Sequence, residues 1–284
     1  MKAALFPNFQ KKNALSCALE VCDMLYSCGI EVSISTDYIR EFNGRKFVLF
    51  EDIEKAVGTS DIFIAIGGDG TILRCAKHLI GTDILLLGIN TGTLGFMAGL
   101  EAYELDKLAG LKTGKYDISQ RMTIDMTLNN ADSGDVYTAL NEISVRSGSF
   151  RICDFEVYSD GYLVGKYRAD GVLFSTPSGS TAYALSAGGP VIEPDLECIE
   201  MNLICPHSLF ARATMFSAYR RLTLVNRTAG DGSLVVSVDG ELERSIGENE
   251  SIEIVRGKNN LNFVNLIGNS FHESLCRKLC RPIK

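Results

Sequence analysis

The sequence predicts an N-terminal doubly wound α/β domain followed by an all-β, sandwich-like domain. Strand-like and helix-like segments alternate through the first part of the chain, and Ile62–Ile66 is apolar without polar alternation, as in a parallel strand covered on both faces. From Arg121 onward, apolar and polar residues alternate with a period of two. We therefore expect residues 1–115 to form the α/β domain, 116–256 the β-rich domain, and 257–284 a strand and helix that return to the first domain.

Each element of the first domain has its own signal. The strand-like segments are Lys2–Phe6, Glu31–Ser35, Ile62–Ile66 and Asp83–Asn90. Apolar residues recur at helical spacing in Asn13–Cys28, Asp52–Val57, Ile72–Ile80 and Glu101–Leu111. Gly29 follows the first helix and is expected to end it.

The second domain is expected to be mostly antiparallel. Its predicted strands are Met122–Leu128, Val136–Val145, Ile152–Tyr158, Leu163–Tyr167, Val172–Ser175, Arg221–Val225, Leu234–Val238, Ser251–Val255 and Leu261–Leu266. Turn signals such as Asp239-Gly240 separate them. The last segment, Ser270–Cys280, has a helical pattern and is expected to pack on the first domain.

Composition excludes several classes of protein. No apolar run approaches the roughly 18 residues of a membrane span, and the first residues lack the layout of a signal peptide. The net charge of −7 argues against a general nucleic-acid binder. The nine cysteines form no CxxC pair and fall mostly in apolar segments, as buried thiols in a reducing compartment do. We expect a soluble cytoplasmic protein without membrane or nucleic-acid partners.

Gly67-Gly-Asp-Gly-Thr71 directly follows the buried strand Ile62–Ile66 and precedes a helix. Its glycines permit close approach of the backbone to phosphate, and a helix N-terminus favours an anion. From spacing alone, Asp69 is equally consistent with a turn or capping residue and with a functional acid. A carboxylate in a phosphate-binding turn opposes anion binding unless it accepts a proton or holds a metal ion, so its position favours phosphoryl transfer to a hydroxyl.

Two other stretches are candidates for ligand binding. The run from Arg168 to Ser186 combines hydroxyls, glycine and Tyr183, whereas a capped Ser/Thr-rich turn explains only one or two of these residues. Asn141-Glu142, within a predicted strand, is either a solvated pair or a contact to adenine and ribose.

Together these motifs resemble the NAD kinase family. The matching motifs, in family order, are Gly67-Gly-Asp-Gly-Thr71, Asn90-Thr-Gly-Thr-Leu-Gly-Phe96, Asn141-Glu142, Asp170-Gly171, Ser175-Thr-Pro-Ser-Gly-Ser-Thr-Ala-Tyr183, Ser186-Ala-Gly-Gly-Pro190, Pro206-His-Ser-Leu209 and Asp239-Gly240. They cover about residues 60–240, and their combination is specific. The first motif alone is not, because diacylglycerol kinases and phosphofructokinases resemble it there.

The resemblance implies transfer of a phosphoryl group from ATP, or from polyphosphate, to the 2′-hydroxyl of the adenosine ribose of NAD. A divalent metal, Mg²⁺ by expectation, accompanies the donor, and the resemblance assigns no protein metal ligand. Asp69 is then the general base. The implied binding residues are Gly70 and Arg74 on the phosphates; Phe96 in the pocket; Asn141, Glu142, Thr181, Ala182, Tyr183 and Ser186 on adenosine; Arg168 and Asp170 on the nicotinamide and subunit-contact side; and Arg151, His207 and Glu241.

The chain departs from the family pattern at two places. Glu241 stands where Gln is common, so a neutral amide becomes an anion near a phosphorylated ligand. After Leu209 the chain reads Phe-Ala-Arg-Ala213 where the family has Ser-Ala-Arg-Pro. Both departures affect the expected donor preference and product affinity. For His207, ligand contact and a structural hydrogen bond are equally consistent with the sequence.

Two other functions compete with NAD kinase. A lipid or diacylglycerol-type kinase shares the glycine turn, but the polar Ser175–Tyr183 run and the lack of a basic amphipathic helix disfavour it. A non-catalytic NAD(P)-binding regulator would need a degraded base, whereas Asp69 is intact. The resemblance also implies a homodimer or homotetramer.

Overall fold

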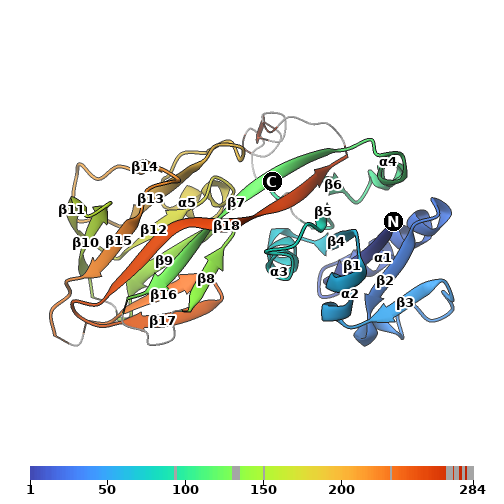
Figure 1. Cartoon of the computed structure of the whole chain (residues 1–284), viewed down its shortest axis with the longest axis horizontal. Coiled ribbons are helices and arrows are strands. Elements are labelled where there is room, and N and C mark those ends of the chain that lie inside the picture. The colour runs from blue at the N-terminus through green and yellow to red at the C-terminus, as the bar shows by residue number, and fades with distance from the viewer. Residues whose placement is uncertain are drawn as a thin grey trace. The chain divides into compact units, whose positions relative to one another are not determined.

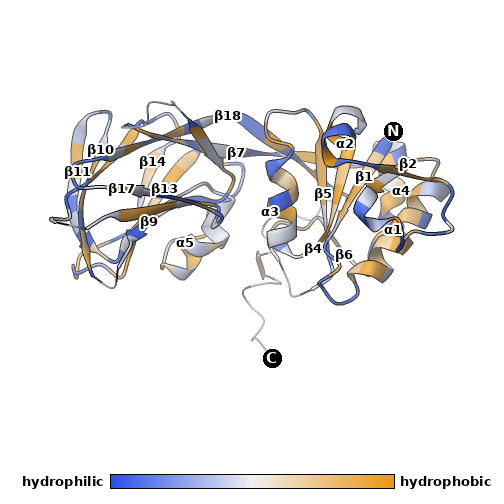
Figure 2. Cartoon of the chain, turned by 90° about the horizontal axis from the view of Figure 1, so that it is seen from below, coloured by the Kyte–Doolittle hydropathy of each residue, from blue (hydrophilic) through white to orange (hydrophobic). Residues whose placement is uncertain are grey.

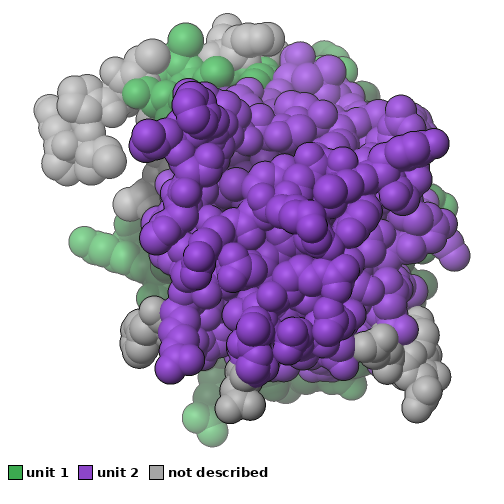
Figure 3. Space-filling view, turned by 90° about the vertical axis from the view of Figure 1, so that its left-hand side faces the viewer, with its two compact units in different colours: residues 1–120, 261–284 green, residues 121–260 purple. Residues whose placement is uncertain are grey.

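The computed structural model describes residues 1–92, 95–129, 135–149, 151–230 and 232–266, with Phe271, Leu275, Cys276 and Leu279 beyond them. The chain forms two compact units, drawn green and purple in Figure 3. Unit 1 comprises Met1–Gln120 and Leu261–Lys284, and unit 2 comprises Arg121–Asn260. The unit boundaries fall within two long strands, β7 (Asp117–Leu128) and β18 (Ser251–Asn265).

Unit 1 contains a parallel sheet with the strand order β3-β2-β1-β4-β5 (Figure 1). Its strands are β1 (Lys2–Pro7), β2 (Glu31–Ser35), β3 (Val48–Glu51), β4 (Ile62–Gly67) and β5 (Leu85–Asn90). The short β6 (Leu100–Glu101) and the last part of β18 also pair with β5 in parallel. The strand order reverses between β1 and β4, so their carboxyl ends form the switch point at which open α/β sheets bind ligands.

The core of unit 1 follows the predicted apolar periodicity. All six residues of β4 are buried, as expected of a parallel strand covered on both faces, and Figure 2 colours β4 and β5 as hydrophobic. The helical elements are α1 (Ala14–Ser27), α2 (Ile53–Thr59), α3 (Asp69–Lys77), α4 (Ala109–Thr113), η1 (Thr36–Tyr38) and η2 (Leu105–Leu108). Gly29, with φ of 71°, follows α1 and ends it as predicted.

Unit 2 is a β-sandwich, as predicted. One sheet has the order β14-β13-β12-β9-β16-β17, formed by β9 (Glu142–Ser147), β12 (Gly171–Ser175), β13 (Cys198–Ile204), β14 (Thr214–Ser217), β16 (Leu234–Val238) and β17 (Leu242–Ile246). The other contains β10 (Cys153–Ser159), β11 (Tyr162–Ala169), β15 (Leu222–Asn226) and β18, and β7 pairs with β8 (Val136–Ala139). Their inward side chains, among them Phe155, Phe174, Met201 and Ile252, form one core.

One predicted strand, Val136–Val145, is interrupted. It forms β8 and β9, which are separated by Leu140 and Asn141. The carboxylate of Asp239 accepts hydrogen bonds from the backbone N–H groups of residues 140, 141 and 142, so these donors do not enter the strand ladder. Periodicity alone does not reveal a break made by a residue almost 100 positions away.

Two further expectations differ from the structure. The predicted helix Glu101–Leu111 begins only at Leu105, because Leu100 and Glu101 pair with β5 instead. The predicted strands Ser251–Val255 and Leu261–Leu266 are one continuous strand, β18. Most of the predicted helix Ser270–Cys280 lies outside the described residues. Within the described ranges, no helix has the length and apolar character needed to cross a bilayer.

Candidate functional site

The turn Gly67–Thr71 connects β4 to α3. Gly67 ends β4, Gly68 is the extended N-cap residue, and Asp69 is the first residue of α3. Position 67 requires glycine, because a Cβ there would collide with Oγ1 of the buried Thr71. The glycine turn therefore opens directly on a helix N-terminus, as the sequence predicts, and such an end favours an anion.

The Asp69 carboxylate lies between the two glycine turns that follow β4 and β5. Its Oδ2 accepts a hydrogen bond from the backbone N–H of Phe96 over 2.7 Å, and its Oδ1 accepts one from Met97 over 3.1 Å. A Cβ at Gly95 would collide with this carboxylate. The structure thus brings Asp69 and Phe96 together and fixes the carboxylate's orientation. Thr93 and Leu94 of the second turn lie outside the described residues.

Asn8 is a neighbour of this turn that sequence reasoning missed. It directly follows β1, and its backbone N–H donates to the carbonyl of Ile66 over 3.0 Å. Its Nδ2 donates to Oγ1 of Thr71 over 3.3 Å. A polar residue directly after a buried strand was the only available signal, and it becomes informative only once β1 is known to lie beside β4.

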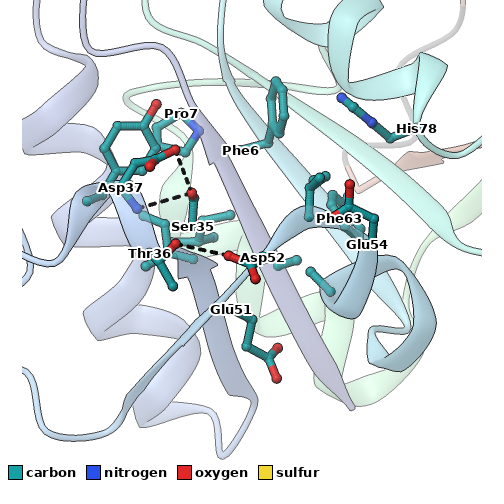
Figure 4. A pocket seen from close by; sticks show the side chains of 16 residues that line it. Phe6, Pro7, Ser35, Thr36, Asp37, Glu51, Asp52, Glu54, Phe63 and His78 are labelled. Atoms are coloured by element: carbon teal, nitrogen blue, oxygen red, sulfur yellow. Dashed lines mark hydrogen bonds between the residues drawn. The ribbon is translucent and has the colours of Figure 1, made fainter.

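A cavity of about 390 Å³ lies at the carboxyl halves of β1 and β2, beside α2 (Figure 4). Its apolar lining includes Phe6, Ile34, Ala56 and Phe63, and its polar lining includes Ser35, Thr36, Asp37, Asp52, Glu54 and His78. Figure 4 shows Ser35, Thr36 and Asp37 on one side of β1 and Phe6 and His78 on the other. An apolar cavity with a few polar groups has the character of a small-molecule site.

In unit 2, Asp239 shapes the backbone of Asn141 and Glu142. Oδ1 of Asp239 accepts from the N–H groups of Asn141 and Glu142 over 2.8 and 3.1 Å, and Oδ2 accepts from Leu140 over 3.0 Å. The N–H of Asp239 donates to the carbonyl of Glu142 over 2.9 Å. The Asp239-Gly240 turn, with φ of 49° and 72°, therefore holds the Asn141-Glu142 loop in place. The sequence predicted the Asp239-Gly240 turn but did not indicate that it bonds the Asn141-Glu142 loop.

Asn141 and Glu142 each present an unused buried acceptor. They are 8% and 9% exposed, and Oδ1 of Asn141 and Oε2 of Glu142 have no hydrogen-bond partner among the described residues. Burial, reinforced by the negative charge of Asp239, raises the pKa of Glu142 to about 7. A buried acceptor without a donor costs about 1–3 kcal/mol, so a ligand that supplies donors here gains affinity. The solvated-pair interpretation of these residues is therefore wrong.

The hydroxyl-rich stretch after β12 divides into two kinds of residue. Thr176 Oγ1 donates to the carbonyl of Leu140 over 2.6 Å, and Ser180 Oγ donates to that of Pro177 over 2.7 Å. These hydroxyls are structural, as the capped-turn interpretation holds. Thr181, Ala182 and Tyr183 are half-buried and Ser186 is exposed, in η3 (Gly179–Thr181) and α5 (Tyr183–Ser186). This second group is accessible to a ligand, although Oγ1 of Thr181 also donates to the carbonyl of Ser178 over 3.2 Å.

A second group of predicted residues lies at the opposite ends of the same strands. Ser175 is paired with Glu142, whereas Gly171 is paired with Arg146, four residues or about 13 Å away. At that end the N–H of His207 donates to the carbonyl of Arg168 over 2.9 Å, and the N–H of Asp170 donates to that of Ile204 over 3.0 Å. Arg151, in the exposed turn before β10, is not within the Asn141-Glu142 group.

The remaining predicted residues are exposed on their elements. Gly70 and Arg74, four residues apart, share one face of α3 in unit 1. Glu241, in the turn after Asp239, is exposed, and its N–H donates to the carbonyl of Val238 over 3.1 Å. In both units the predicted residues thus lie on loops or element ends, where ligands have access.

The chain is similar to known proteins in sequence and in fold. Residues 4–112 match the model of the ATP-NAD kinase N-terminal domain, and residues 140–266 match that of the ATP-NAD kinase C-terminal domain. The chain is 33% identical over 285 residues to the NAD kinase of Lachnoclostridium phytofermentans, with 98% of both chains covered. Its fold is similar to that of yeast NADH kinase complexed with NADH, with a TM-score of 0.88, 22% identity, and coverage of 100% of this chain and 90% of that one. It is also similar to an NAD kinase from Archaeoglobus fulgidus in complex with ATP, with a TM-score of 0.75, 24% identity and 98% of both chains covered. Because the two matched domains together span most of its length, the chain belongs to the NAD kinase family.

Proposed function

We propose that this chain transfers a phosphoryl group from ATP to the 2′-hydroxyl of the adenosine ribose of NAD, giving NADP, with Asp69 as the general base. Family membership supports the reaction. The observation that carries the role of Asp69 is its carboxylate, held by two backbone N–H groups at the start of α3.

The geometry of Asp69 fits a base. A carboxylate has about four lone-pair positions, and the N–H groups of Phe96 and Met97 use one on each oxygen. The remaining positions are free to accept a hydroxyl proton, while the two bonds hold the carboxylate in one orientation. The neighbouring glycine turn and helix N-terminus favour the phosphates of the donor. Catalysis then depends mainly on positioning and electrostatics, as in other phosphoryl transfers.

Unit 2 supplies recognition of the acceptor in this proposal. Asn141 and Glu142 offer buried acceptors to the adenine amino group and the ribose hydroxyls, and Tyr183 offers a ring for stacking. Thr181, Ala182 and Ser186 complete the adenosine contacts, whereas Arg168 and Asp170, at the other end of β12, serve the nicotinamide side. For Phe96, Arg151, His207 and Glu241, contact with the bound nucleotides stays a prediction from the sequence.

A divalent metal, Mg²⁺, is proposed to enter with the donor. Mg²⁺ is commonly held by one or two carboxylates together with substrate phosphates and waters. Where side chains are described, no three His, Cys, Asp or Glu residues converge into a metal-binding group. In the proposal the metal is carried on the donor phosphates, whose charge it neutralises.

The cavity beside β1 and β2 is proposed as the donor's nucleoside site. In doubly wound folds an acid near the end of the second strand binds ribose hydroxyls, and Asp37 occupies that position after β2. Asp37 accepts a hydrogen bond from Oγ of Ser35 over 3.0 Å, which orients its carboxylate. Phe6 and Phe63 supply apolar and aromatic surface for a base.

The exposed edge of the six-stranded sheet supports a homodimer or homotetramer. β14 is an edge strand, and its neighbourhood exposes large apolar side chains: Leu209 is 91%, Phe210 89% and Met215 44% exposed. Unpaired edge strands and exposed apolar patches attract partners. A two-fold symmetric contact between copies would cover both. Location in the cytoplasm stays a prediction from the sequence.

Asp69→Asn should lower kcat for NADP formation from ATP and NAD by about 10²-fold or more, because an amide cannot accept the hydroxyl proton. Steady-state assays measure kcat, and calorimetry measures NAD affinity. Unchanged NAD affinity would show that the turn at Phe96 is intact. The matched control is Asp83→Asn, an exposed acid of the same unit. Near-normal turnover in Asp69→Asn would refute the base, and a phosphorylated lipid product in place of NADP would refute the acceptor.

The KM for NAD should fall as pH rises through about 7. Glu142 binds ribose hydroxyls best as a carboxylate, and its raised pKa keeps it protonated below that pH. If only the ionised form binds, affinity increases up to about tenfold from one unit below this pKa to one unit above it. The free energy of unfolding, in contrast, should decrease as pH rises from about 4.5 to about 7. In that range the unfolded state loses the Glu142 proton, whereas the folded state retains it. Glu142→Gln should remove the step in KM, and the exposed control Glu248→Gln should keep it. A step that persists in Glu142→Gln would exclude this residue as its source.

Asp37→Ala should raise the KM for ATP about tenfold and leave the KM for NAD unchanged, because a lost hydrogen bond to a charged group costs about 1.5–3 kcal/mol. Turnover with polyphosphate as donor, which has no nucleoside, should not change. Glu41→Ala, four residues further along the chain, is the matched exposed control. An equal effect on ATP and polyphosphate would place the donor nucleoside elsewhere.

Phe210→Asp should lower the mass of the assembly measured by light scattering. Aromatic anchors at the centre of interfaces contribute about 2 kcal/mol or more, so dissociation should become at least about 30-fold easier. Tyr162→Asp, an 81% exposed aromatic residue on β11, is the control and should leave the mass unchanged. A wild-type chain that is monomeric at micromolar concentration would contradict the proposed assembly.

A further inference from the structure

A buried carboxyl–amide pair on β13 has no place in the reaction described so far. Glu200 has no exposed surface, and Asn202 is 2% exposed. Nδ2 of Asn202 donates to Oε1 of Glu200 over 2.6 Å, while Oε2 of Glu200 has no hydrogen-bond partner within the described residues. Burial raises the pKa of the Glu200 carboxyl above its ordinary value, and the bond from Asn202 opposes this in part. Burial of an apolar side chain at this position would cost less free energy than burial of a carboxyl group. The presence of a carboxyl here therefore indicates a specific role.

Glu200 lies on the sheet face that carries the proposed adenosine residues. Ser175 of β12 is paired with Glu142 of β9 on one side and with Glu200 of β13 on the other. Paired residues of antiparallel strands share a face, and neighbouring strands are about 4.8 Å apart, so the two carboxyl groups flank Ser175. The residues that alternate with them and face the core are Ile143, Phe174 and Met201.

Segment 176–190, which follows β12, lies close to this face at two glycines. At the first, Gly179, a Cβ would collide with the carbonyl oxygen of Asn141 and lie 2.6 Å from Oγ of Ser175. The N–H of Thr176 also donates to that carbonyl over 2.9 Å. The start of the segment is therefore fixed to the Asn141 loop.

The second glycine, Gly189, lies on the carboxyl–amide pair. A Cβ there would collide with both Oε1 of Glu200 and Nδ2 of Asn202. The N–H of Gly189 donates to the carbonyl of Ala184, within α5, over 3.0 Å. The two bonded polar atoms cannot move aside without losing their mutual bond. They therefore determine how closely the end of α5 approaches the sheet.

We propose that Glu200 is a positioning residue for the acceptor nucleotide. The hydrogen-bonded side chains of Glu200 and Asn202 pack against Gly189. This contact fixes the position of α5, and with it Tyr183 and Ser186, which are proposed to contact adenosine. The inference rests on the proposed role of segment Thr181–Ser186 in binding NAD. It assigns Glu200 no contact with either substrate.

Steady-state kinetics of four single variants and one double variant test the proposal. Glu200→Ala should raise the KM for NAD about tenfold, because displacement of binding residues by an ångström has effects of this size or larger. Its kcat at saturating NAD and its KM for ATP should stay within about twofold of the wild type. Glu200→Gln should restore the KM, because its amide keeps the shape and the acceptor for Asn202.

The matched control is Met201→Ala, on the same strand but in the core of the opposite face. It should lower the melting temperature without raising the KM for NAD. An equal rise in the KM for NAD in Met201→Ala and Glu200→Ala would show that Glu200 contributes only to the stability of the fold, and would overturn the proposal. An unchanged KM in Glu200→Ala would also overturn it.

Gly189→Ala tests the same contact from the segment's side and covers the case in which Glu200→Ala does not fold. The added methyl should raise the KM for NAD. In Gly189→Ala/Glu200→Ala, loss of the carboxyl removes one of the two clashing atoms and releases the Asn202 amide from its bond, so that this amide can turn away from the methyl. The combined effect should therefore be smaller than the product of the two. An unchanged KM in Gly189→Ala, or a double variant with the full product, would overturn the proposal. If the wild type proves to lack kinase activity, the proposed function fails, and NAD dissociation constants from calorimetry replace KM in the same comparison.

Discussion

Close approach of the backbone to polar groups is the constraint on which the candidate site loops of both units depend. In each case a glycine lies where a Cβ would collide with polar atoms: Gly67 with Thr71, Gly95 with Asp69, Gly179 with Asn141, and Gly189 with Glu200 and Asn202. At these points the backbone of each loop packs directly on polar groups. The polar groups stay beside the loops, where a ligand can also reach the lone pairs that remain. Glycine is needed for this arrangement because any other residue separates the loop from its support.

The buried acids of unit 2 differ because their partners differ. Asp239 accepts three backbone hydrogen bonds, whereas no described residue donates to Oε2 of Glu142 or of Glu200. The satisfied acid supplies the negative charge that, after burial itself, raises the pKa of Glu142 to about 7. One carboxylate therefore shapes the loop, and its neighbour titrates near neutral pH. Asp239 thus contributes both to the shape of the loop and to the raised pKa of Glu142, although its own carboxylate oxygens are occupied by backbone hydrogen bonds.

The sequence predicted the fold because the pattern of apolar residues determines it locally. Ile62–Ile66 has no polar residue, which requires cover on both faces, and Met122–Leu128 alternates, which requires one covered face. The predicted strand Val136–Val145 is interrupted where backbone N–H groups donate to the Asp239 carboxylate, and such long-range bonds leave no trace in local periodicity. The motifs similarly singled out Asp69 and Asn141-Glu142 as candidate site residues. They did not point to Asn8 or Glu200, because the contacts of these two residues depend on which strands are neighbours in a sheet.

Under the proposed function, recognition of the acceptor depends on fewer groups than the hydroxyl-rich sequence implies. Thr176 and Ser180 bond backbone carbonyls, so they contribute order and leave selectivity to other residues. Buried acceptors discriminate strongly, since a ligand without the matching donor leaves them unsatisfied, whereas apolar contacts distinguish similar ligands only weakly. Under the proposed function, Oδ1 of Asn141 and Oε2 of Glu142 are the two buried acceptors available for this purpose among the described adenosine residues. Selection of the nucleoside then rests on two atoms whose positions are set by Asp239. Stacking on Tyr183 contributes to affinity but little to specificity.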